Sequence, residues 1–281
     1  MLRDDAMIVR LSISQWTGRK FDKGVTQRVA REYAVDESVG RYNKVLIAKE
    51  AIQGITKVVS GARAFHYQNT LPWDDGGSRI LPSKNFLEYS KRMRGYREEF
   101  ESAVREFVTN YQAYRDDAQR ALGGLFNPAD YPGVHEIEHK FGFSTDIDPV
   151  PSSEDFRVSI QSAEAARIKK ELEERVQQRV VEATRDLYVR LNDVVAKVAD
   201  KLSDKDAIFR DSLVENVVEL VNLLPKLNVG NDPKLDELAK ETKKKLCALE
   251  PDAIRKDAKV RTKAAEDAKA ILDKMSGYLG G

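Results

Sequence analysis

The sequence predicts a mainly α-helical protein: an elongated, antiparallel bundle of long, coiled-coil-like helices with a small α+β end. Apolar residues recur at a spacing of three and four along residues 83–122 and again along 162–202. Of the 281 residues 33% are charged, yet the net charge is only +1. This balance is typical of long solvated helices, and it argues against a whole-molecule nucleic-acid footprint, which normally carries a large basic excess.

The N-terminal segment, residues 1–82, is predicted to contain a strand, two helices and a loop. Polar and apolar residues alternate from Ile8 to Trp16, the period of a half-buried strand. Asp22 is expected to cap a short helix, and a second helix is expected over residues 40–64. The apolar face of the short helix is expected to be Val25, Val29 and Tyr33.

Two long helices are predicted next. Ser83 is expected to be the N-cap of the helix over residues 83–122, which ends at Gly123-Gly124. The second helix begins near Ser162. Because both carry a single apolar stripe, we expect them to pack against each other, with the aromatic stripe of the first as a buried seam and not a cofactor site. That stripe is Phe86, Tyr89, Met93, Tyr96, Phe100, Ala103, Phe107, Tyr111, Tyr114 and Ala118.

The insert between the long helices, residues 123–161, is predicted to form a small α/β region. It contains a short helix near His135–Phe141 and two extended pieces, 143–150 and 155–160. These pieces could pair with the N-terminal strand in a small sheet at one end of the helical body.

The C-terminal segment, residues 162–281, is expected to be helical throughout. One apolar helix face runs from Phe209 to Pro225, and Asp232-Pro233 is typical of the start of the next helix. A last amphipathic helix is expected over Val260–Met275. The four segments together are expected to form one or two structural domains.

Composition also bears on location. The single cysteine, Cys247, excludes an intramolecular disulfide and a multi-cysteine metal site, and its apolar neighbours favour a buried spacer. No segment approaches the roughly 18 apolar residues of a membrane span, and the N-terminus does not resemble a signal peptide. We therefore expect a cytoplasmic protein without membrane partners.

One catalytic motif is present. His135-Glu136-Ile137-Glu138-His139 matches H-E-x-x-H, in which two histidines bind zinc and the glutamate acts as general base. The context is poor, because the predicted helix is short and charged and ends at Gly142. A third ligand would have to be Glu154 or Glu164. A zinc-dependent hydrolase using His135, His139 and Glu136 is therefore an alternative, and exposed surface histidines are the favoured interpretation.

Other enzyme signatures are missing. The sequence contains no P-loop, no G-x-G-x-x-G motif and no G-x-S-x-G elbow. We therefore expect no enzyme activity, no cofactor and no bound metal.

A basic stretch on the first long helix offers a second alternative. Lys91, Arg92, Arg94 and Arg97 alternate with aromatic residues and could follow a phosphate backbone, as in a nucleic-acid-binding accessory protein. Acidic residues lie beside them, which favours an ion-paired helix face. Residues 1–67 carry twelve basic and seven acidic side chains, a net charge of +5 that could orient self-association or a partner.

The loop Phe65–Pro82 is long, non-periodic and rich in large apolar residues. We predict a strap anchored by Leu71, Trp73 and Leu81, with Asp74-Asp75 as an exposed acidic turn. Carboxylates held up by packed aromatic residues could dock on a basic or metal-bearing partner. The candidate partner-binding residues are Trp73, Asp74, Asp75 and Arg79.

Four stretches together resemble an uncharacterised family of bacteriophage and conjugative-element proteins, and the likeness covers most of the chain. They are ISQWTGRKFDK (13–23), YNKVLIAKEAI (42–52), NTLPWDDGGSRILP (69–82) and DAIFRDSLVENVVELVNLLPKLN (206–228). Members of this family tend to be encoded beside MoxR-type AAA+ ATPases and von Willebrand factor A-type proteins. The resemblance implies an accessory or adaptor role in a bacterial host cytoplasm, with one of those proteins as partner. Homo-oligomerisation is a further option, which the uneven charge along the chain suggests.

Overall fold

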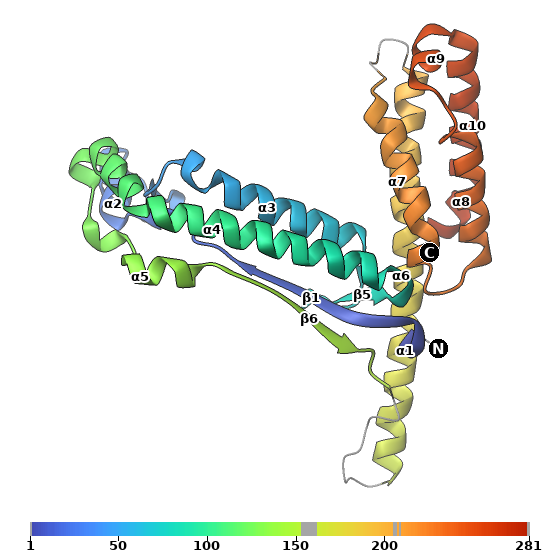
Figure 1. Ribbon diagram of the computed structural model, residues 1–281, viewed down its shortest axis with the longest axis horizontal. Coiled ribbons are helices and arrows are strands. Elements are labelled where there is room, and N and C mark those ends of the chain that lie inside the picture. Colours follow the sequence, from blue (N-terminus) through green and yellow to red (C-terminus); the bar gives the residue numbers. More distant parts are fainter. Residues whose placement is uncertain (1, 153–161, 205–206, 208, 280–281) are drawn as a thin grey trace. The chain divides into compact units, whose positions relative to one another are not determined.

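The computed structural model describes residues 2–152, 162–204, 207 and 209–279 (Figure 1). The predicted extended piece 155–160 and the possible ligand Glu154 lie outside the described residues. The prediction of a mainly α-helical protein is confirmed, and the strands of the described residues form one small sheet and a two-stranded ribbon. Among the helices of the described residues, none has an apolar run long enough to span a bilayer.

The helices and strands alternate in the first half of the chain, and helices follow in the second. The helices are α1 (Leu2–Asp5), α2 (Lys23–Glu32), α3 (Lys49–Gln68), α4 (Phe86–Leu122), α5 (Val134–Ile137), α6 (Ser162–Ser203), α7 (Asp211–Leu227), α8 (Pro233–Lys245), α9 (Pro251–Lys256) and α10 (Ala258–Leu279). The strands are β1 (Ala6–Ser14), β2 (Arg19–Phe21), β3 (Asn43–Val45), β4 (Leu71–Pro72), β5 (Arg79–Pro82) and β6 (Gly142–Pro149). One sheet has the order β4-β5-β1-β6, and β2 and β3 form a separate ribbon.

The chain divides into two compact units, each built from segments that are distant in sequence. Unit 1 contains residues 1–10, 67–90 and 146–281, and unit 2 contains residues 11–66 and 91–145. Each boundary falls inside an element, so β1, α3, α4 and β6 each contribute residues to both units.

Unit 1 is a helical bundle around α6, which packs against α10 and α7, while α8 packs against α7 and α10 (Figure 1). The predicted stripe of α6 is buried in its C-terminal half, where Leu187 and Leu191 are fully inaccessible, and it is only half-buried from Ala165 to Val180. Packing of the two long helices against each other is not confirmed. In unit 1 it is α10 that covers α6, and its contribution includes the buried residues Ala268 and Ile271.

The predicted N-terminal strand and its pairing with residues 143–150 are confirmed, because β1 lies between β5 and β6. On the other side of β1, Ile8 is opposite Ile80, and Leu71 of β4 is opposite Ile80 as well. These three side chains are buried in the core of unit 1. The segment predicted as a loop thus contains a β-hairpin, whose strands became recognisable only through their pairing with β1.

Unit 2 has its own core, formed mainly by the aromatic stripe of α4. Phe107 lies within 5.7 Å, between ring centroids, of both Tyr111 and Tyr114, and Phe100 lies 5.6 Å from Phe143. Helix α3 packs on α4 so closely that a Cβ added at Gly61 would lie 3.2 Å from the ring of Tyr96. Within unit 2 the predicted stripe is buried at Phe100, Phe107, Tyr111 and Ala118 and half-buried at Tyr96, Ala103 and Tyr114.

Two predicted helix starts are wrong. The helix predicted over 40–64 begins at Lys49, because residues 43–45 pair with β2 and Leu46 donates a backbone hydrogen bond to the Gly18 carbonyl. Ser83 is not the N-cap of α4. It opens a 3-10 turn and donates its hydroxyl to the Asp5 carbonyl, and α4 begins at Phe86.

The remaining predictions of helix caps and helix ends are confirmed or differ from the structure by a few residues. Asp22 and Asp232 cap α2 and α8 as predicted, by accepting hydrogen bonds from the backbone N–H groups of Val25 and Lys234. The short insert helix is one α-helical turn followed by a 3-10 turn at Glu138–Lys140. Helix α7 continues two residues past Pro225, and α1 and α9 were not predicted.

A buried lysine organises unit 2. The Lys44 ammonium lies 2.6 Å from the Asp130 carboxylate and 3.3 Å from that of Asp22, and it donates to the Leu125 carbonyl at 2.9 Å. The hydrogen bond to Asp130 raises the pKa of Lys44. Burial alone would raise the pKa of Asp130, but hydrogen bonds from Lys44 and Lys20 outweigh it and lower that pKa. Lys44 therefore connects β3 to the turns that follow α4.

Phe100→Asp tests the unit 2 core. We expect it to lower the free energy of unfolding by about 3–5 kcal/mol, because it removes a buried ring and leaves an unpaired buried charge. Leu87→Asp is the matched control on the same helix, since Leu87 is 80% exposed, and it should change stability by less than about 0.5 kcal/mol. Urea unfolding measures both. If Phe100→Asp cost as little stability as is expected for Leu87→Asp, the Phe100 face of α4 would not be buried.

Lys44→Met tests the buried ion pair. It should cost about 3–5 kcal/mol, because the Asp130 carboxylate is left buried without its main partner. Lys20→Met is the control: Lys20 also lies 2.9 Å from Asp130, but its side chain is 50% exposed, so we expect less than about 1 kcal/mol.

The ion pair also predicts a pH dependence. Because the folded-state pKa of Asp130 is lowered, its contribution is present above the ordinary value of 3.8 and is lost as pH falls through the folded value. Urea unfolding at neutral pH and near pH 3 measures how much the free energy of unfolding falls on acidification. This fall should be smaller in Lys44→Met than in the wild type. An equal or larger fall in Lys44→Met would contradict the stabilising contribution of the Lys44–Asp130 ion pair.

Candidate functional site

The hairpin of β4 and β5 holds the predicted partner-binding residues. Leu71 and Leu81 are fully buried, and the half-buried Trp73 packs against the unit 1 core. Of the three predicted anchors, Leu71 and Trp73 therefore contact this core, Trp73 less deeply than expected, and Leu81 is buried without being part of that cluster.

The two adjacent carboxylates have different surroundings. Asp74 Oδ1 accepts a hydrogen bond from the Ser78 backbone N–H at 3.0 Å, and Arg10 donates to the Ser78 hydroxyl at 2.9 Å. Gly77 has φ +88°, which favours glycine. Asp74 is therefore part of the turn structure, and Asp75 is the exposed carboxylate.

Arg79 is directed into the protein. Its Nε donates to the Thr70 hydroxyl at 2.7 Å and its Nη2 to the Thr70 carbonyl at 3.0 Å. Arg190 of α6 donates to the same carbonyl at 2.8 Å and to that of Gln68 at 3.0 Å, and it forms an ion pair with Asp186. Burial, and then the charge of Arg190, lower the pKa of Arg79. The two guanidinium groups connect the end of α3, the hairpin and α6, so the geometry gives Arg79 a structural role.

The H-E-x-x-H residues do not converge on a metal site. His135 and His139 are exposed, and the change from α-helix to 3-10 turn between them alters the spacing that the motif requires. Glu136 Oε2 accepts a hydrogen bond from the Gly133 backbone N–H at 3.1 Å, so this carboxylate caps its own helix. Within the described residues, no group of three or more His, Cys, Asp or Glu side chains is arranged to hold a metal ion.

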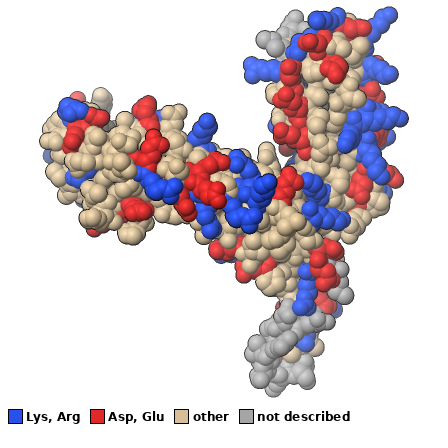
Figure 2. Space-filling model, viewed as in Figure 1, with Lys and Arg blue, Asp and Glu red and all other residues tan. Residues whose placement is uncertain are grey.

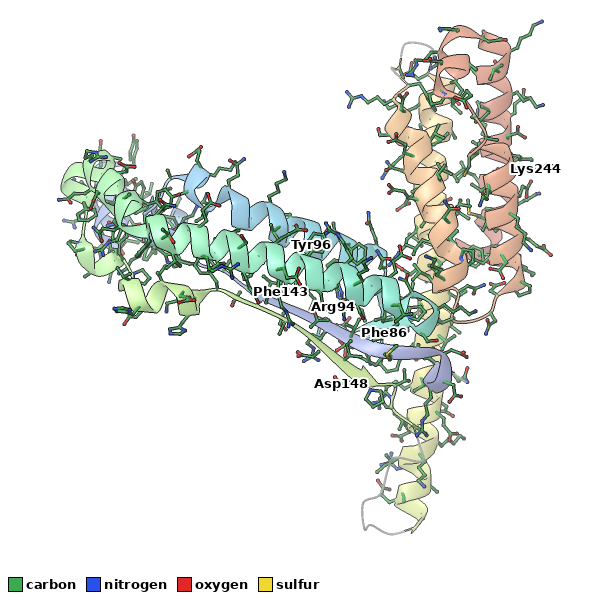
Figure 3. All side chains as sticks on the ribbon, in the orientation of Figure 1. Phe86, Arg94, Tyr96, Phe143, Asp148 and Lys244 are labelled. Carbon is green, nitrogen blue, oxygen red and sulfur yellow. The ribbon has the colours of Figure 1, made fainter. Side chains whose placement is uncertain are left out.

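The basic stretch of α4 contains one paired and three exposed cations. Arg92 lies 2.8 Å from the Glu99 carboxylate, and its guanidinium is stacked 3.8 Å from the ring centre of Tyr96. The Glu99 hydrogen bond raises the pKa of Arg92. Lys91, Arg94 and Arg97 are exposed, and Figure 3 shows Arg94 and Tyr96 on α4. Figure 2 shows acidic and basic side chains intermixed along this helix.

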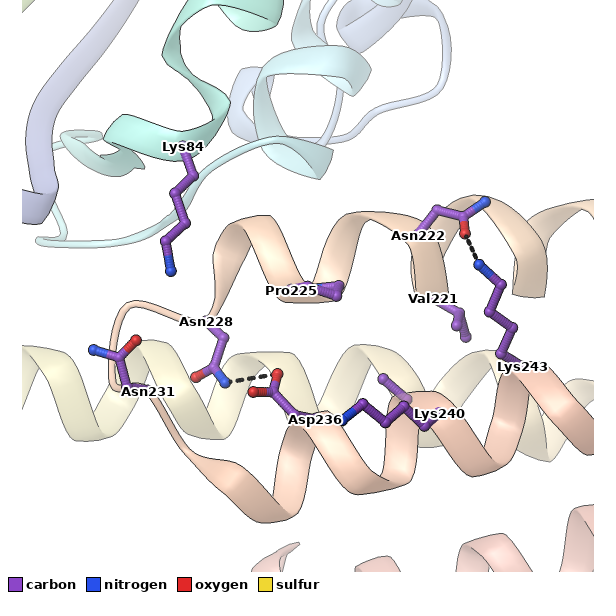
Figure 4. A pocket seen from close by; sticks show the side chains of 10 residues that line it. Lys84, Val221, Asn222, Pro225, Asn228, Asn231, Asp236, Lys240 and Lys243 are labelled. Carbon is purple, nitrogen blue, oxygen red and sulfur yellow. Dashed lines mark hydrogen bonds between the residues drawn. The ribbon is translucent and has the colours of Figure 1, made fainter.

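Unit 1 has a polar pocket of about 460 Å³ lined largely by α7 and α8 (Figure 4). Lys243 donates to the Asn222 side chain at 3.1 Å, and the Asn228 amide donates to Asp236 at 3.0 Å. Lys84 also lines it. Several of its polar groups are thus satisfied by one another, and the pocket has no constellation of catalytic type.

The most unusual surface was not predicted from the sequence. Seven of the fourteen exposed large hydrophobic side chains among the described residues lie between residues 21 and 45, and we call these seven the apolar surface. They are Phe21, Val29, Tyr33, Val35, Val39, Tyr42 and Val45. Figure 2 shows much uncharged surface at the end of unit 2 that carries α2.

The orientation of α2 explains this exposure. The predicted buried face of this helix was Val25, Val29 and Tyr33, but the buried residues are Thr26 and Ala30. The Thr26 hydroxyl donates to the Asp22 carbonyl at 2.8 Å and accepts from the Tyr42 backbone N–H at 3.0 Å, which turns this face inward. The sequence analysis therefore predicted the wrong face of α2 as buried: the face with Thr26 and Ala30 is buried, and Val29 and Tyr33 are exposed.

The apolar surface is hollowed. Five of its members line a depression of about 290 Å³, whose rim includes Asp36, Glu37 and Arg41. Ala34, between two members, has φ +53°, an uncommon conformation for a residue with a Cβ. The Val35 backbone N–H donates to the Ala30 carbonyl at 2.9 Å, which holds this reversal at the end of α2.

Comparison with protein-family models, with curated proteins and with solved structures found no match for this chain.

Substitution of the two hairpin carboxylates tests the turn assignment. Asp74→Ala should cost about 1 kcal/mol, because the Ser78 N–H loses its acceptor. Asp75→Ala should change stability by less than about 0.5 kcal/mol, since it alters only an exposed position. Denaturant unfolding of the two single variants measures both, and identical midpoints would contradict the structural role of Asp74.

Proposed function

We propose that the protein is a non-enzymatic adaptor that binds another protein through the apolar surface of unit 2. The observation that carries the proposal concerns the large hydrophobic side chains that are exposed among the described residues: half of them lie in 25 consecutive residues, and five of these line one depression. Contiguous exposed apolar patches of this kind typically mark interaction sites on soluble proteins.

The composition of the surface fits a protein partner. Tyr33, Tyr42 and Phe21 supply aromatic side chains, which are enriched at interfaces, and aliphatic residues surround them. The depression provides a place for an anchoring side chain, and the charged rim provides orientation.

The backbone reversal supports the same interpretation. A residue with a Cβ in the left-handed region costs roughly 1–2 kcal/mol, and such conformations gather at functional sites. At Ala34 this conformation places Tyr33 and Val35 on the surface, where both are exposed.

The occupant that we propose is a different protein that inserts a large apolar side chain into the depression. The resemblance to mobile-element proteins directs the first tests to a MoxR-type AAA+ ATPase and to a von Willebrand factor A-type protein. Asp75 stays a candidate second contact, since it is the exposed carboxylate of the hairpin turn. Trp73, Asp74 and Arg79 would then support that contact from within the fold.

Photo-crosslinking tests the proposal with a matched pair of positions. Benzoylphenylalanine replaces Val39, which is 72% exposed on the apolar surface, or Val181, which is 67% exposed on α6. With each candidate partner co-expressed in turn, position 39 should give a crosslink to that partner and position 181 should not.

A second change identifies the depression as the contact. Tyr33→Ser, at a side chain that is 70% exposed, should reduce the crosslink at least tenfold and leave the melting temperature unchanged, because a surface substitution barely affects folding. Crosslinks only to a second copy of the chain, with a doubled mass in ultracentrifugation, would replace the adaptor proposal by a homodimer. Equal crosslinking from positions 39 and 181 would refute it.

A further inference from the structure

A second groove of unit 2, distinct from the depression of the apolar surface, has the character of an anion site. It has a volume of about 770 Å³ and is lined on one side by a single face of α3. That face consists of Lys49, Ile52, Gln53, Thr56, Lys57 and Ser60, whose spacing of three and four places them in one row along the helix.

The opposite wall comes from the chain around β2 and β3. It includes Arg19 of β2, Asn43 of β3 and the segment 15–17. Most of the lining side chains are therefore cationic, amide or hydroxyl groups, and they belong to one compact unit.

All charged side chains that line the groove are positively charged. Arg19, Lys49 and Lys57 are exposed, and the described lining residues include no aspartate or glutamate. In the described part of the chain none of these three cations forms a hydrogen bond or ion pair with an acidic side chain, in contrast to Arg92, which Glu99 neutralises. Adjacent cations without counterions attract a negatively charged ligand.

The spacing of the cations indicates an elongated ligand. Lys49 and Lys57 are eight residues apart on one helix, which corresponds to about 12 Å along the axis. A single phosphate group would leave most of this row without a partner. A ligand with several negative charges along its length fits this row, and the amide and hydroxyl groups between the lysines can donate hydrogen bonds to it.

One aromatic residue makes the site more specific. The half-buried Trp16 lines the groove, and its ring centroid lies 5.9 Å from that of Tyr111 and 6.2 Å from that of Phe107. The aromatic core thus holds the ring in a defined orientation at the groove wall. A cationic groove with a fixed aromatic ring is the arrangement by which proteins bind single-stranded nucleic acid.

We propose that this groove of unit 2 binds single-stranded nucleic acid. Arg19, Lys49 and Lys57 contact successive phosphates, and a base packs on Trp16. The site is separate from the stretch Lys91–Arg97 of α4. It does not depend on the adaptor proposal, because the groove and the depression have no lining residue in common, although Val45 of the apolar surface also lines the groove.

Trp16 itself reports on binding. The chain has two tryptophans, so Trp73→Phe leaves Trp16 as the only one. Titration with oligothymidine or oligouridine of about twelve nucleotides, a length within the usual site sizes, should quench its fluorescence. The DNA and RNA oligomers show which sugar the groove prefers, and a DNA duplex should bind more weakly.

Salt dependence counts the phosphate contacts. Three cations predict a slope of log K against log salt near −2, because each contact on a single strand contributes about −0.7. Affinity should therefore fall about twentyfold between roughly 50 and 200 mM salt.

A charge-matched pair of triple variants, each in the Trp73→Phe background, locates the site. The variant Arg19→Ala/Lys49→Ala/Lys57→Ala should lose affinity at least tenfold and flatten the salt slope. The control replaces three other exposed cations of unit 2, in Lys23→Ala/Arg105→Ala/Lys140→Ala, and should retain the affinity. Circular dichroism and the melting temperature establish that both variants fold.

Several results would overturn the proposal. Equal losses in both triple variants would mean non-specific attraction to the net charge of unit 2. A loss in Lys91→Ala/Arg94→Ala/Arg97→Ala without a loss in the groove variant would place binding on α4. Polyglutamate binding as tightly as the oligonucleotides would identify an acidic peptide as the ligand. Unchanged Trp16 fluorescence together with no retention of any oligonucleotide would exclude the site.

Discussion

Burial of the apolar stripe of α6 is the interaction on which unit 1 depends. A helix of 42 residues cannot be stabilised by propensity alone, and its Leu187 and Leu191 are fully inaccessible to solvent. Each such side chain contributes roughly 1.5–3 kcal/mol on burial. Ion pairs on the outer side of α6, such as Lys170 with Glu174, are exposed and contribute far less. In unit 2 the corresponding role belongs to the aromatic stripe of α4, centred on Phe107.

The sequence predicted most helices and strands correctly, but it did not predict which helices pack against each other. The C-terminal end of α4, both ends of α6, the position of β1 and the caps at Asp22 and Asp232 follow from local rules of periodicity and hydrogen bonding. Periodicity identifies an apolar face but carries no information on which helix covers it. Hence α10 as the partner of α6 could not be predicted. The extended start of residues 40–48 also depends on distant contacts, those of Lys44 with Asp130 and Leu125.

The candidate sites show the same limit. The exposure of Val29 and Tyr33 was missed because α2 is only ten residues long, and a short helix offers two plausible apolar faces. The choice is made by the Thr26 hydroxyl, which has partners on both sides. The basic groove combines residues 15–19, 43–47 and 49–60, so only the folded chain brings them together. The only hint of this groove in the sequence was the net charge of +5 over residues 1–67.

The boundaries of the two units inside β1, α3, α4 and β6 have a consequence for synthesis on the ribosome. All of unit 2 has been made once residue 145 has emerged, so its aromatic core can close early. The hairpin around Leu71 and Ile80 has emerged by then, but much of its apolar cover, including Leu187 and Leu191, has not yet left the ribosome. The nascent chain must therefore carry an exposed apolar sheet edge through the synthesis of about 40 further residues. During that interval it is a natural client for a chaperone that binds extended hydrophobic segments.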